Sequence, residues 1–412
     1  MRAVGIIAEY NPFHNGHQLQ INEAKKSSDC SHAICVMSGN FMQRGEPAIF
    51  DKWKRAEMAV TGGADLVLEL PVVFAVRSAQ YFAQGGVRLL NALGVVGHLS
   101  FGAEHPDLEI LQKIAEATEN KEVIEALQLN LQNGQTYAAA LSNAILSIQT
   151  VPKEILTSPN NILAIEYLRS IRKFAPTIIP IAIKRQHANY HDINITGSIA
   201  SATAIRRSLV ERQNDDISRT VPPEVYSIIQ EITKNQRGPS EAGKLDNIIL
   251  AKLRTTKASE LEKIPDVSEG LHNKMMSSAL EAGNTTELLA LIKSRRYTGT
   301  RLRRILIHLL LGTSQAEIVH FDKQGPLYAR VLAFNKKGRE LLGEINKTSS
   351  IPLVTKTTHY LNSRSRNNHD LDTLQKMLSY DTLATDIYTL SLPAAPWTYG
   401  GLDFRHSPIY HP

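Results

Sequence analysis

The stretch that decides the fold is residues 3–17, AVGIIAEYNPFHNGH. A short β-branched run ends in a polar loop, and the loop brings His14 and His17 to the start of a helix predicted over residues 17–26. A helix N-terminus carries unpaired N–H groups and a positive dipole end, which favour an anion such as a triphosphate. Gly16 lets the backbone approach closely, and both imidazoles can donate to phosphate oxygens. A His-x-x-His pair alone is a weak signal; its place after the first strand makes it a candidate phosphate site.

Short apolar runs alternate with helical patterns through the first half of the chain. Strands separated by helices imply parallel pairing through right-handed crossovers, and hence a doubly wound, Rossmann-like α/β sheet. We expect this sheet domain to occupy residues 1–215, with a helical insertion over residues 106–147. The predicted strands are residues 4–8, 32–37, 66–70, 98–101 and 178–183.

After residue 215 the spacing of apolar residues is mostly helical. Residues 216–412 are therefore expected to form a second, mostly helical domain. Two β-rich runs, residues 327–334 and 351–355, predict a small accessory sheet within it, and a last helix is expected over residues 370–388.

Composition restricts the class of protein. The chain has 412 residues, 46 Lys and Arg against 40 Asp and Glu, and a formal net charge of +6. No apolar run reaches the ~20 residues of a membrane span, and no secretory leader is apparent, so we expect a cytoplasmic protein without a membrane partner. Two cysteines, Cys30 and Cys35, are too few for a disulfide scaffold or a cysteine metal site, and no metal ligand is assigned.

A second motif, Ala200-Ser201-Ala202-Thr203-Ala204-Ile205-Arg206, lies at the end of the predicted sheet domain. Ser201 is a favourable helix N-cap, and Thr203 offers a hydroxyl donor. Arg206 adds a permanent charge about one turn into the helix.

These two motifs resemble the nucleotidyltransferase superfamily that carries an HxGH signature on a Rossmann-like sheet, although Ala202 stands where that superfamily usually has a serine. Three longer segments are similar to the bacterial tRNA(Met) cytidine acetate ligase family, and residues 158–163, SPNNIL, extend the resemblance over about the first 210 residues. The segments are residues 5–17, GIIAEYNPFHNGH; residues 37–47, MSGNFMQRGEP; and residues 63–71, GADLVLELP.

The resemblance implies an enzyme that uses ATP, together with Mg²⁺, to activate acetate as acetyl-adenylate. It then transfers the acetyl group to N4 of the wobble cytidine of elongator tRNA(Met). The resemblance also implies catalytic roles for His14, His17 and Arg206 around the triphosphate. Either Asn160 or Asn161 would contact the nucleotide. The implied ATP contacts are Ile7, Ala8, Glu9, Tyr10, Asn11, Pro12, Phe13, Asn15, Gly16, Gln20, Gly102, Asn160, Asn161, Arg185, Ser201 and Thr203.

Basic residues are concentrated in residues 293–304. Tyr297 lies among them, and this run contains no acidic residue. Such a cluster suits the backbone of a tRNA, because phosphate contacts supply most of the sequence-independent affinity. A smaller group around Trp53, formed by Lys52, Lys54 and Arg55, is a second candidate for RNA contact. The predicted RNA-binding residues are Arg295, Arg296, Arg301, Arg303 and Arg304.

Two other functions remain open at this point. One is an adenylyltransferase acting on a small phosphorylated metabolite, although such an enzyme does not require the helical extension or the basic cluster. The other is a nucleotide-sensing RNA-binding protein whose sheet domain no longer turns over. The presence of both histidines with Thr203 and Arg206 argues against a dead site.

Overall fold

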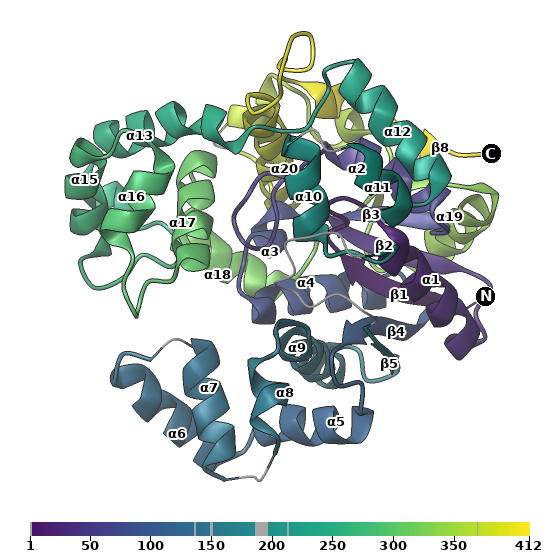
Figure 1. The fold of residues 1–412 in the computed structure, drawn as a ribbon, viewed down its shortest axis with the longest axis horizontal. Coiled ribbons are helices and arrows are strands. Elements are labelled where there is room, and N and C mark those ends of the chain that lie inside the picture. The colour runs from purple at the N-terminus through teal and green to yellow at the C-terminus, as the bar shows by residue number, and fades with distance from the viewer. Residues whose placement is uncertain (1, 136, 149–150, 186–196, 212–213, 369) are drawn as a thin grey trace.

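The computed structural model describes residues 2–135, 137–148, 151–185, 197–211, 214–368 and 370–412. Its centre is one eight-stranded sheet with the order β5-β4-β1-β2-β3-β6-β7, and β8 pairs with β6 (Figure 1). The strands are β1 Ala3–Ala8, β2 Ala33–Ser38, β3 Leu66–Leu70, β4 Val96–Ala103, β5 Ile179–Lys184, β6 Ala329–Phe334, β7 Leu353–Val354 and β8 Ile409–Tyr410.

Strands β1 to β5 are mutually parallel, which confirms the doubly wound sheet. The chain order reverses between β1 and β4, and a sheet of this kind binds ligands at the carboxyl ends of its strands at such a switch point. The loop with the two histidines leaves β1 at this edge. Topology alone therefore brings the predicted phosphate site to the switch point.

Helices cover both faces of the sheet. Helices α1 (Asn15–Ser28) and α2 (Lys52–Thr61) pack on one face, while α4 (Ala79–Ala92) and α9 (Pro159–Phe174) pack together on the other. Side chains of β1 alternate between the two cores: Val4 and Ile6 join one cluster, and Ala3 and Ile7 the other. Burial on both faces explains why β1 is an apolar run without polar alternation.

The sheet is not confined to the first 215 residues. Strand β6 from the C-terminal half lies antiparallel to β3, and β7 and β8 pair with β6. The separate accessory sheet expected from residues 327–334 and 351–355 is therefore wrong, because these runs extend the main sheet. The division into residues 1–215 and 216–412 stays a prediction, but it does not separate the sheet from the rest of the chain.

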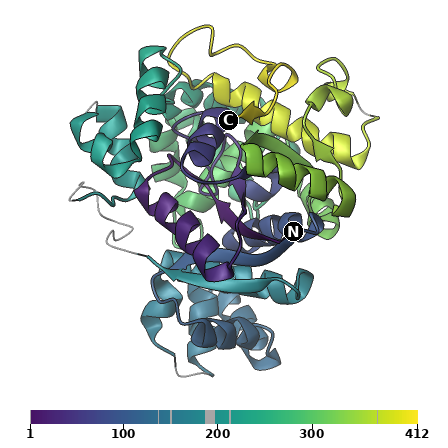
Figure 2. The same cartoon turned by 90° about the vertical axis from the view of Figure 1, so that its right-hand side faces the viewer.

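The predicted helical segments are confirmed. Helices α5 to α8 form a lobe on the opposite side of the sheet from α20, as Figures 1 and 2 show. No helix in the described ranges is long and apolar enough to cross a membrane. The remaining helices are α3 Val72–Ala75, α5 Leu108–Ala117, α6 Lys121–Gln132, α7 Tyr137–Leu146, α8 Lys153–Thr157, α10 Ala202–Glu211, α11 Asn214–Thr220, α12 Pro223–Lys234, η1 Ala242–Leu245, α13 Asp246–Thr255, α14 Ala258–Leu261, α15 Leu271–Glu281, α16 Thr285–Ile292, α17 Gly299–Leu311, α18 Gln315–Gln324, α19 Lys336–Thr348, η2 Thr357–His359, η3 Ser365–Asn367, α20 Thr373–Thr389 and η4 Leu402–Phe404.

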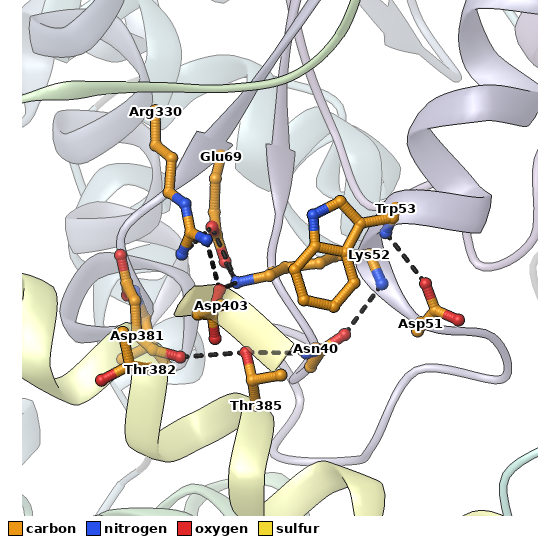
Figure 3. Close-up of polar contacts among 12 residues, drawn as sticks. Asn40, Asp51, Lys52, Trp53, Glu69, Arg330, Asp381, Thr382, Thr385 and Asp403 are labelled. Carbon is orange, nitrogen blue, oxygen red and sulfur yellow. Dashed lines mark hydrogen bonds and ion pairs between the residues drawn. The ribbon is translucent and has the colours of Figure 1, made fainter. Parts of the chain in front are cut away.

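Buried ion pairs join the C-terminal segments to the sheet (Figure 3). Lys52 Nζ lies 2.9 Å from Glu69 Oε1 and 2.7 Å from Asp403 Oδ1, and Arg330 pairs with the same two carboxylates. All four side chains are almost fully buried. Burial alone raises the pKa of Asp403, but the charges of Arg330 and Lys52 outweigh burial and lower it to about 2. We name these four residues the buried ion-pair cluster; its charges sum to zero.

The buried ion-pair cluster also supports the loop that follows β2. Asn40 Oδ1 accepts a 2.8 Å hydrogen bond from the backbone N–H of Lys52, and Asn40 Nδ2 donates to Thr385 Oγ1 on α20 at 3.1 Å (Figure 3). Glu69, at the C-terminal end of β3, is a member of this cluster. Residues from both halves of the chain therefore hold this loop in place by hydrogen bonds to Asn40.

Candidate active site

A cavity of about 240 Å³ opens at the carboxyl edge of the sheet. It is lined by the ends of β1 and β4, the first turns of α1 and α10, and the loop after β2. The structure brings most of the predicted site residues together here. Those that line the cavity are Ile7, Ala8, Glu9, Tyr10, Asn11, His14, His17, Gln20, Gly102, Asn160, Arg185, Ser201, Thr203 and Arg206.

His14 and His17 form a stacked pair at the N-terminus of α1, with ring centroids 3.7 Å apart. His14 is the N-cap: its Nδ1 accepts from the backbone N–H of Gly16 at 3.1 Å, and Nδ1 of His17 accepts from the N–H of His14 at 3.3 Å. Burial, with the charges of Arg185 and Arg206, lowers the pKa of His14 to about 3. The same burial, with its neighbours His14 and Arg185, lowers the pKa of His17.

Both rings are therefore neutral at neutral pH. Because each Nδ1 accepts a backbone hydrogen bond, the ring proton must be on Nε2. The helix start thus presents two neutral N–H donors in addition to its own backbone N–H groups. This arrangement suits a polyanion without the desolvation cost of burying two imidazolium charges.

The second predicted motif faces these histidines. Ser201 Oγ accepts from the N–H of Ala204 at 3.0 Å, which confirms its expected place as the cap of α10. Arg206 donates to the carbonyl oxygen of Asn11 at 2.8 Å and to Thr203 Oγ1 at 3.2 Å. Arg206 is thereby held across the loop that carries the histidines, with its charge on the cavity wall.

Gly102 and Arg185 meet at the pairing of β4 with β5. A Cβ atom on Gly102 would lie 3.3 Å from Cγ of Arg185, so the glycine leaves room for the arginine side chain as well as for a ligand. The backbone N–H of Arg185 donates to the carbonyl oxygen of Ala103 at 3.0 Å. Both residues line the cavity.

Asn160 and Asn161 occupy different environments. Asn160 lines the cavity, and its Nδ2 donates to Glu104 Oε1 at 2.6 Å. Asn161 is fully buried, and its Oδ1 accepts from the backbone N–H of His105 at 3.1 Å. Of the two, the structure places Asn160 where a nucleotide can touch it and Asn161 behind it in the helix packing.

Four further predicted ATP contacts do not line this cavity: Pro12, Phe13, Asn15 and Gly16. Phe13 is buried in the core on the α1 face. Asn15 donates to the backbone carbonyls of Ser198 and Arg219, at 2.8 and 2.9 Å, and so ties the start of α1 to the segments around α10. Gly16 lines a small adjoining cavity of about 50 Å³. These residues shape the loop, because a motif of consecutive residues cannot point every side chain inward.

The loop after β2 forms another wall. Met42, Gln43, Arg44 and Glu46 line the cavity. Gly45 has φ +77°, and a Cβ atom there would lie 2.4 Å from the backbone nitrogen of Arg304 on α17. Only glycine allows this backbone conformation and this close approach together. The loop is therefore seated against the basic helix.

Apart from Asn160, the residues of α4 and α9 that complete the cavity were not among the predicted site residues. Ala79 and Phe82 come from the first turn of α4, and Leu163 and Tyr167 from α9. Each stands in an amphipathic helix, where its spacing is that of a core residue. No local signal in the sequence distinguishes them from the rest of the apolar face.

The basic cluster lies on α17 and in the residues just before it, and two of its arginines pair with acidic residues from other segments. Arg296 pairs with Glu269, and Arg303 lies 3.5 Å from Glu46. Arg301 Nη2 donates to the carbonyl oxygen of Asp266 at 2.7 Å. Arg295 is exposed.

A larger cavity of about 710 Å³ lies beside this cluster and shares Ala79 with the first cavity. One wall carries arginines and hydroxyls: Arg296, Arg301, Arg304, Ser268, Thr298 and Thr300. The other wall, from α6 to α9, is mainly apolar: Leu131, Leu141, Ile145, Leu156, Ile162 and Ile165. We call this the arginine-lined cavity.

Arg304 is half-buried on the wall of the arginine-lined cavity, beside other positive charges. Burial, with the charges of Arg301, Arg77 and Arg44, outweighs the attraction of Asp266 and lowers the pKa of Arg304. Its Nε has no hydrogen-bond partner within the described ranges. An anion in the cavity would satisfy that nitrogen and relieve the repulsion between the arginines.

The second predicted RNA contact is wrong. Lys52 and Arg55 are fully buried, and Trp53 is 2% exposed. Arg55 donates to backbone carbonyls beneath the loop after β2, and Lys52 belongs to the buried ion-pair cluster. From sequence alone, lysines and arginines on a helix look solvent-exposed, because the acidic residues that pair with them in the interior are distant in the chain.

In the part of the chain that the structure describes, no group of three or more His, Cys, Asp or Glu side chains could hold a metal ion. Both cysteines are buried free thiols.

Comparison with known proteins places this geometry in context. The sequence signature of the HIGH Nucleotidyl Transferase family matches residues 1–398. A tRNA(Met) cytidine acetate ligase of a Thermoanaerobacter species is 43% identical, with 98% of this chain and 99% of that protein aligned. The ligase of Acetivibrio thermocellus is 40% identical, over 99% of this chain and all of that one. The crystal structure of Thermotoga maritima TmcAL bound with alpha-thio ATP superposes with a TM-score of 0.91 at 33% identity, covering 100% of this chain and 99% of that chain.

Proposed function

Because the chain belongs to the HIGH nucleotidyl transferase family and, within it, to the tRNA(Met) cytidine acetate ligases, we infer that it is an ATP-dependent ligase that acetylates a cytidine of tRNA(Met). One observation carries the inference: the pair of neutral histidines at the start of α1 and the guanidinium of Arg206 line the same cavity. The solved structure that this chain superposes on holds an ATP analogue.

The first half of the reaction is activation of acetate. A carboxylate oxygen of acetate attacks the α-phosphorus of ATP, the bond to the bridging oxygen breaks, and pyrophosphate leaves. His14 and His17 would donate from Nε2 to the phosphate oxygens, and Arg206 would balance the charge that grows on the leaving group. We propose that Mg²⁺ enters with ATP; it would supply positive charge for the leaving pyrophosphate, and Glu46 on the cavity wall would offer it one carboxylate ligand.

The second half transfers the acetyl group to N4 of cytidine. The mixed anhydride is vulnerable to water, so the cavity must hold it until the base arrives. The neighbouring arginine-lined cavity offers the approach. We propose that anticodon nucleotides of elongator tRNA(Met) lie in it, with phosphates along Arg296, Arg301 and Arg304 and bases against the apolar wall. The wobble cytidine would then reach the ATP cavity past Ala79, and a tRNA substrate makes the cytoplasm the expected place of action.

The function is tested by incubating the purified protein with ATP, labelled acetate and a tRNA(Met) transcript. We expect nearly stoichiometric label in the tRNA, recovered as N4-acetylcytidine by mass spectrometry, and none when ATP or acetate is left out. A transcript with uridine at the wobble position is the control and should remain unlabelled. Adenylyl transfer to a small phosphorylated metabolite with no label in tRNA would instead identify the adenylyltransferase alternative.

The RNA path is tested by the double variant Arg301→Ala/Arg304→Ala. Each lost phosphate contact lowers the slope of log affinity against log salt by roughly 0.7 to 1, so we expect a slope shallower by about 1.5 to 2. Lys336→Ala/Lys347→Ala on α19 removes the same charge far from the cavity and should leave the slope unchanged. Equal slopes for the α17 variant and the wild type would show that the RNA lies elsewhere.

A further inference from the structure

The hydroxyl of Tyr167 is a buried polar group left unsatisfied beside the reaction centre. Tyr167 lies in the middle of α9, is 2% exposed, and packs its ring against Phe101 with centroids 5.7 Å apart. Its side chain lines the ATP cavity, and its hydroxyl has no hydrogen-bond partner within the described ranges. A buried tyrosine hydroxyl usually finds a partner, so an orphan at a cavity wall points to a ligand that supplies one.

A carboxylate lines the same cavity. Glu9 follows directly after β1 and lines the cavity, and its Oε1 accepts a 2.6 Å hydrogen bond from the backbone N–H of Gln43. Burial raises its pKa despite the nearby charges of Arg206, Arg44 and Arg55. The negative charge of Glu9 also contributes to the raised pKa of Tyr167, so the two groups are within electrostatic reach of each other.

Apolar side chains line the same cavity as Tyr167. Ala79 and Phe82 of α4 and Leu163 of α9 line the cavity with Phe101. A small methyl group beside a carbonyl fits such a surface, with one hydrogen-bond donor for the oxygen and one acceptor for a proton. Phosphates have no apolar part and the ribose carries several hydroxyls, whereas an acetyl group combines one methyl with one carbonyl oxygen.

We propose that Glu9 and Tyr167 form the acetyl-transfer site, in which Tyr167 donates to the acetyl oxygen and Glu9 accepts the proton of the attacking amine. This proposal rests on the proposed function. The lone pair of cytidine N4 forms a bond to the acetyl carbon, and the bond from that carbon to the phosphate oxygen breaks, with its electron pair leaving on AMP. The N4 proton moves to Glu9, and the Tyr167 hydroxyl stabilises the oxyanion of the tetrahedral intermediate.

The two half-reactions give separate readouts for the full-length enzyme. Acetate-dependent exchange of pyrophosphate into ATP measures activation, and single-turnover labelling of tRNA measures transfer. Glu9→Gln keeps the acceptor for Gln43 but cannot take a proton. Because Glu9 also lines the ATP cavity, the readout is the ratio of the two half-reactions: we expect transfer relative to exchange to fall by roughly 100-fold. Wild-type transfer should fall on acidification at a pH above the usual carboxylate range, and this dependence should disappear in Glu9→Gln.

Tyr167→Phe removes only the hydroxyl. We expect the KM for acetate in the exchange reaction to rise at least about tenfold with an unchanged KM for ATP, since a hydrogen bond from a hydroxyl to a charged carboxylate is worth roughly that factor or more. Tyr380→Phe is the control, because it removes a buried hydroxyl that bonds Glu317 outside the cavity, and it should leave both constants unchanged.

Glu9→Asp retains a carboxylate and should recover part of the transfer rate. If Glu9→Gln transfers the acetyl group at the wild-type rate, or if its exchange and transfer rates fall equally, the proposed role of Glu9 is wrong. An unchanged KM for acetate in Tyr167→Phe would overturn that of Tyr167. Absence of acetate-dependent exchange in the wild-type enzyme is a different result, since it would refute the proposed function itself.

Discussion

His14→Asn is expected to slow acetate-dependent ATP–pyrophosphate exchange by between about 100-fold and 1,000-fold, the usual cost of losing one preorganised donor at a developing charge. Asparagine is a favourable N-cap, and its Oδ1 can replace the Nδ1 that accepts from Gly16. What the variant lacks is the Nε2–H donor. The loss should therefore appear in turnover, while thermal unfolding changes by no more than a few degrees.

A matched substitution makes this prediction specific. In His17→Gln the amide nitrogen can extend to the place of Nε2, so this variant should retain more exchange activity than His17→Asn. Because the pKa of His14 lies near 3, activity should also show no step from this residue around pH 6.5. Exchange at the wild-type rate in His14→Asn would exclude His14 from phosphate binding, and a collapse of helical circular dichroism would assign it a purely structural role.

Asp403→Asn is expected to lower the free energy of unfolding by about 3 to 5 kcal/mol, the cost of leaving a buried charge uncompensated. Lys52 and Arg330 would then share the single carboxylate of Glu69 in an almost water-free environment. Urea unfolding followed by circular dichroism measures the effect. The asparagine has nearly the same volume, so the loss reports charge and not packing.

The pH dependence gives a second readout of the same carboxylate. The pKa of Asp403 is lowered to about 2 in the folded protein, so its contribution is present above the unfolded pKa of about 3.9 and is lost as the pH falls towards 2. Asp403→Asn should lack this part of the acid transition. Glu109→Gln, which breaks an exposed pair with Lys113, is the control and should unfold like the wild type. Unfolding of Asp403→Asn at the wild-type urea midpoint would show that the cluster is dispensable.

The parallel strands were predictable because each has a local signal in the sequence. β1 to β5 are short apolar runs between helical patterns, and handedness rules then leave few ways to pair them. β6 has the same local signal, and its existence was predicted, but its partner was not. Pairing with β3 depends on where the helical half folds back, and nothing in the run of residues 329–334 specifies that.

The site shows the same division between local and distant information. His14, His17, Ser201 and Arg206 lie in short motifs whose spacing fits a helix start, and the structure brings them to one cavity. Tyr167 gave no signal, because an aromatic residue in an amphipathic helix looks like core. The RNA contact predicted around Trp53 was wrong because the partners of Lys52 are far away in sequence. The acids that neutralise Lys52 lie on β3 and near the C-terminal end of the described chain.

The antiparallel pairing of β6 with β3 has a consequence for protein synthesis. On the ribosome, β1 to β5 and both phosphate-binding motifs emerge well before β6, and Asp403 emerges later still. Until then β3 is an open sheet edge, and Lys52 and Glu69 lack two of their buried partners. A nascent chain that already carries every residue of the ATP cavity thus cannot finish its sheet. Until β6 pairs with it, the exposed edge of β3 is a template for pairing with another chain.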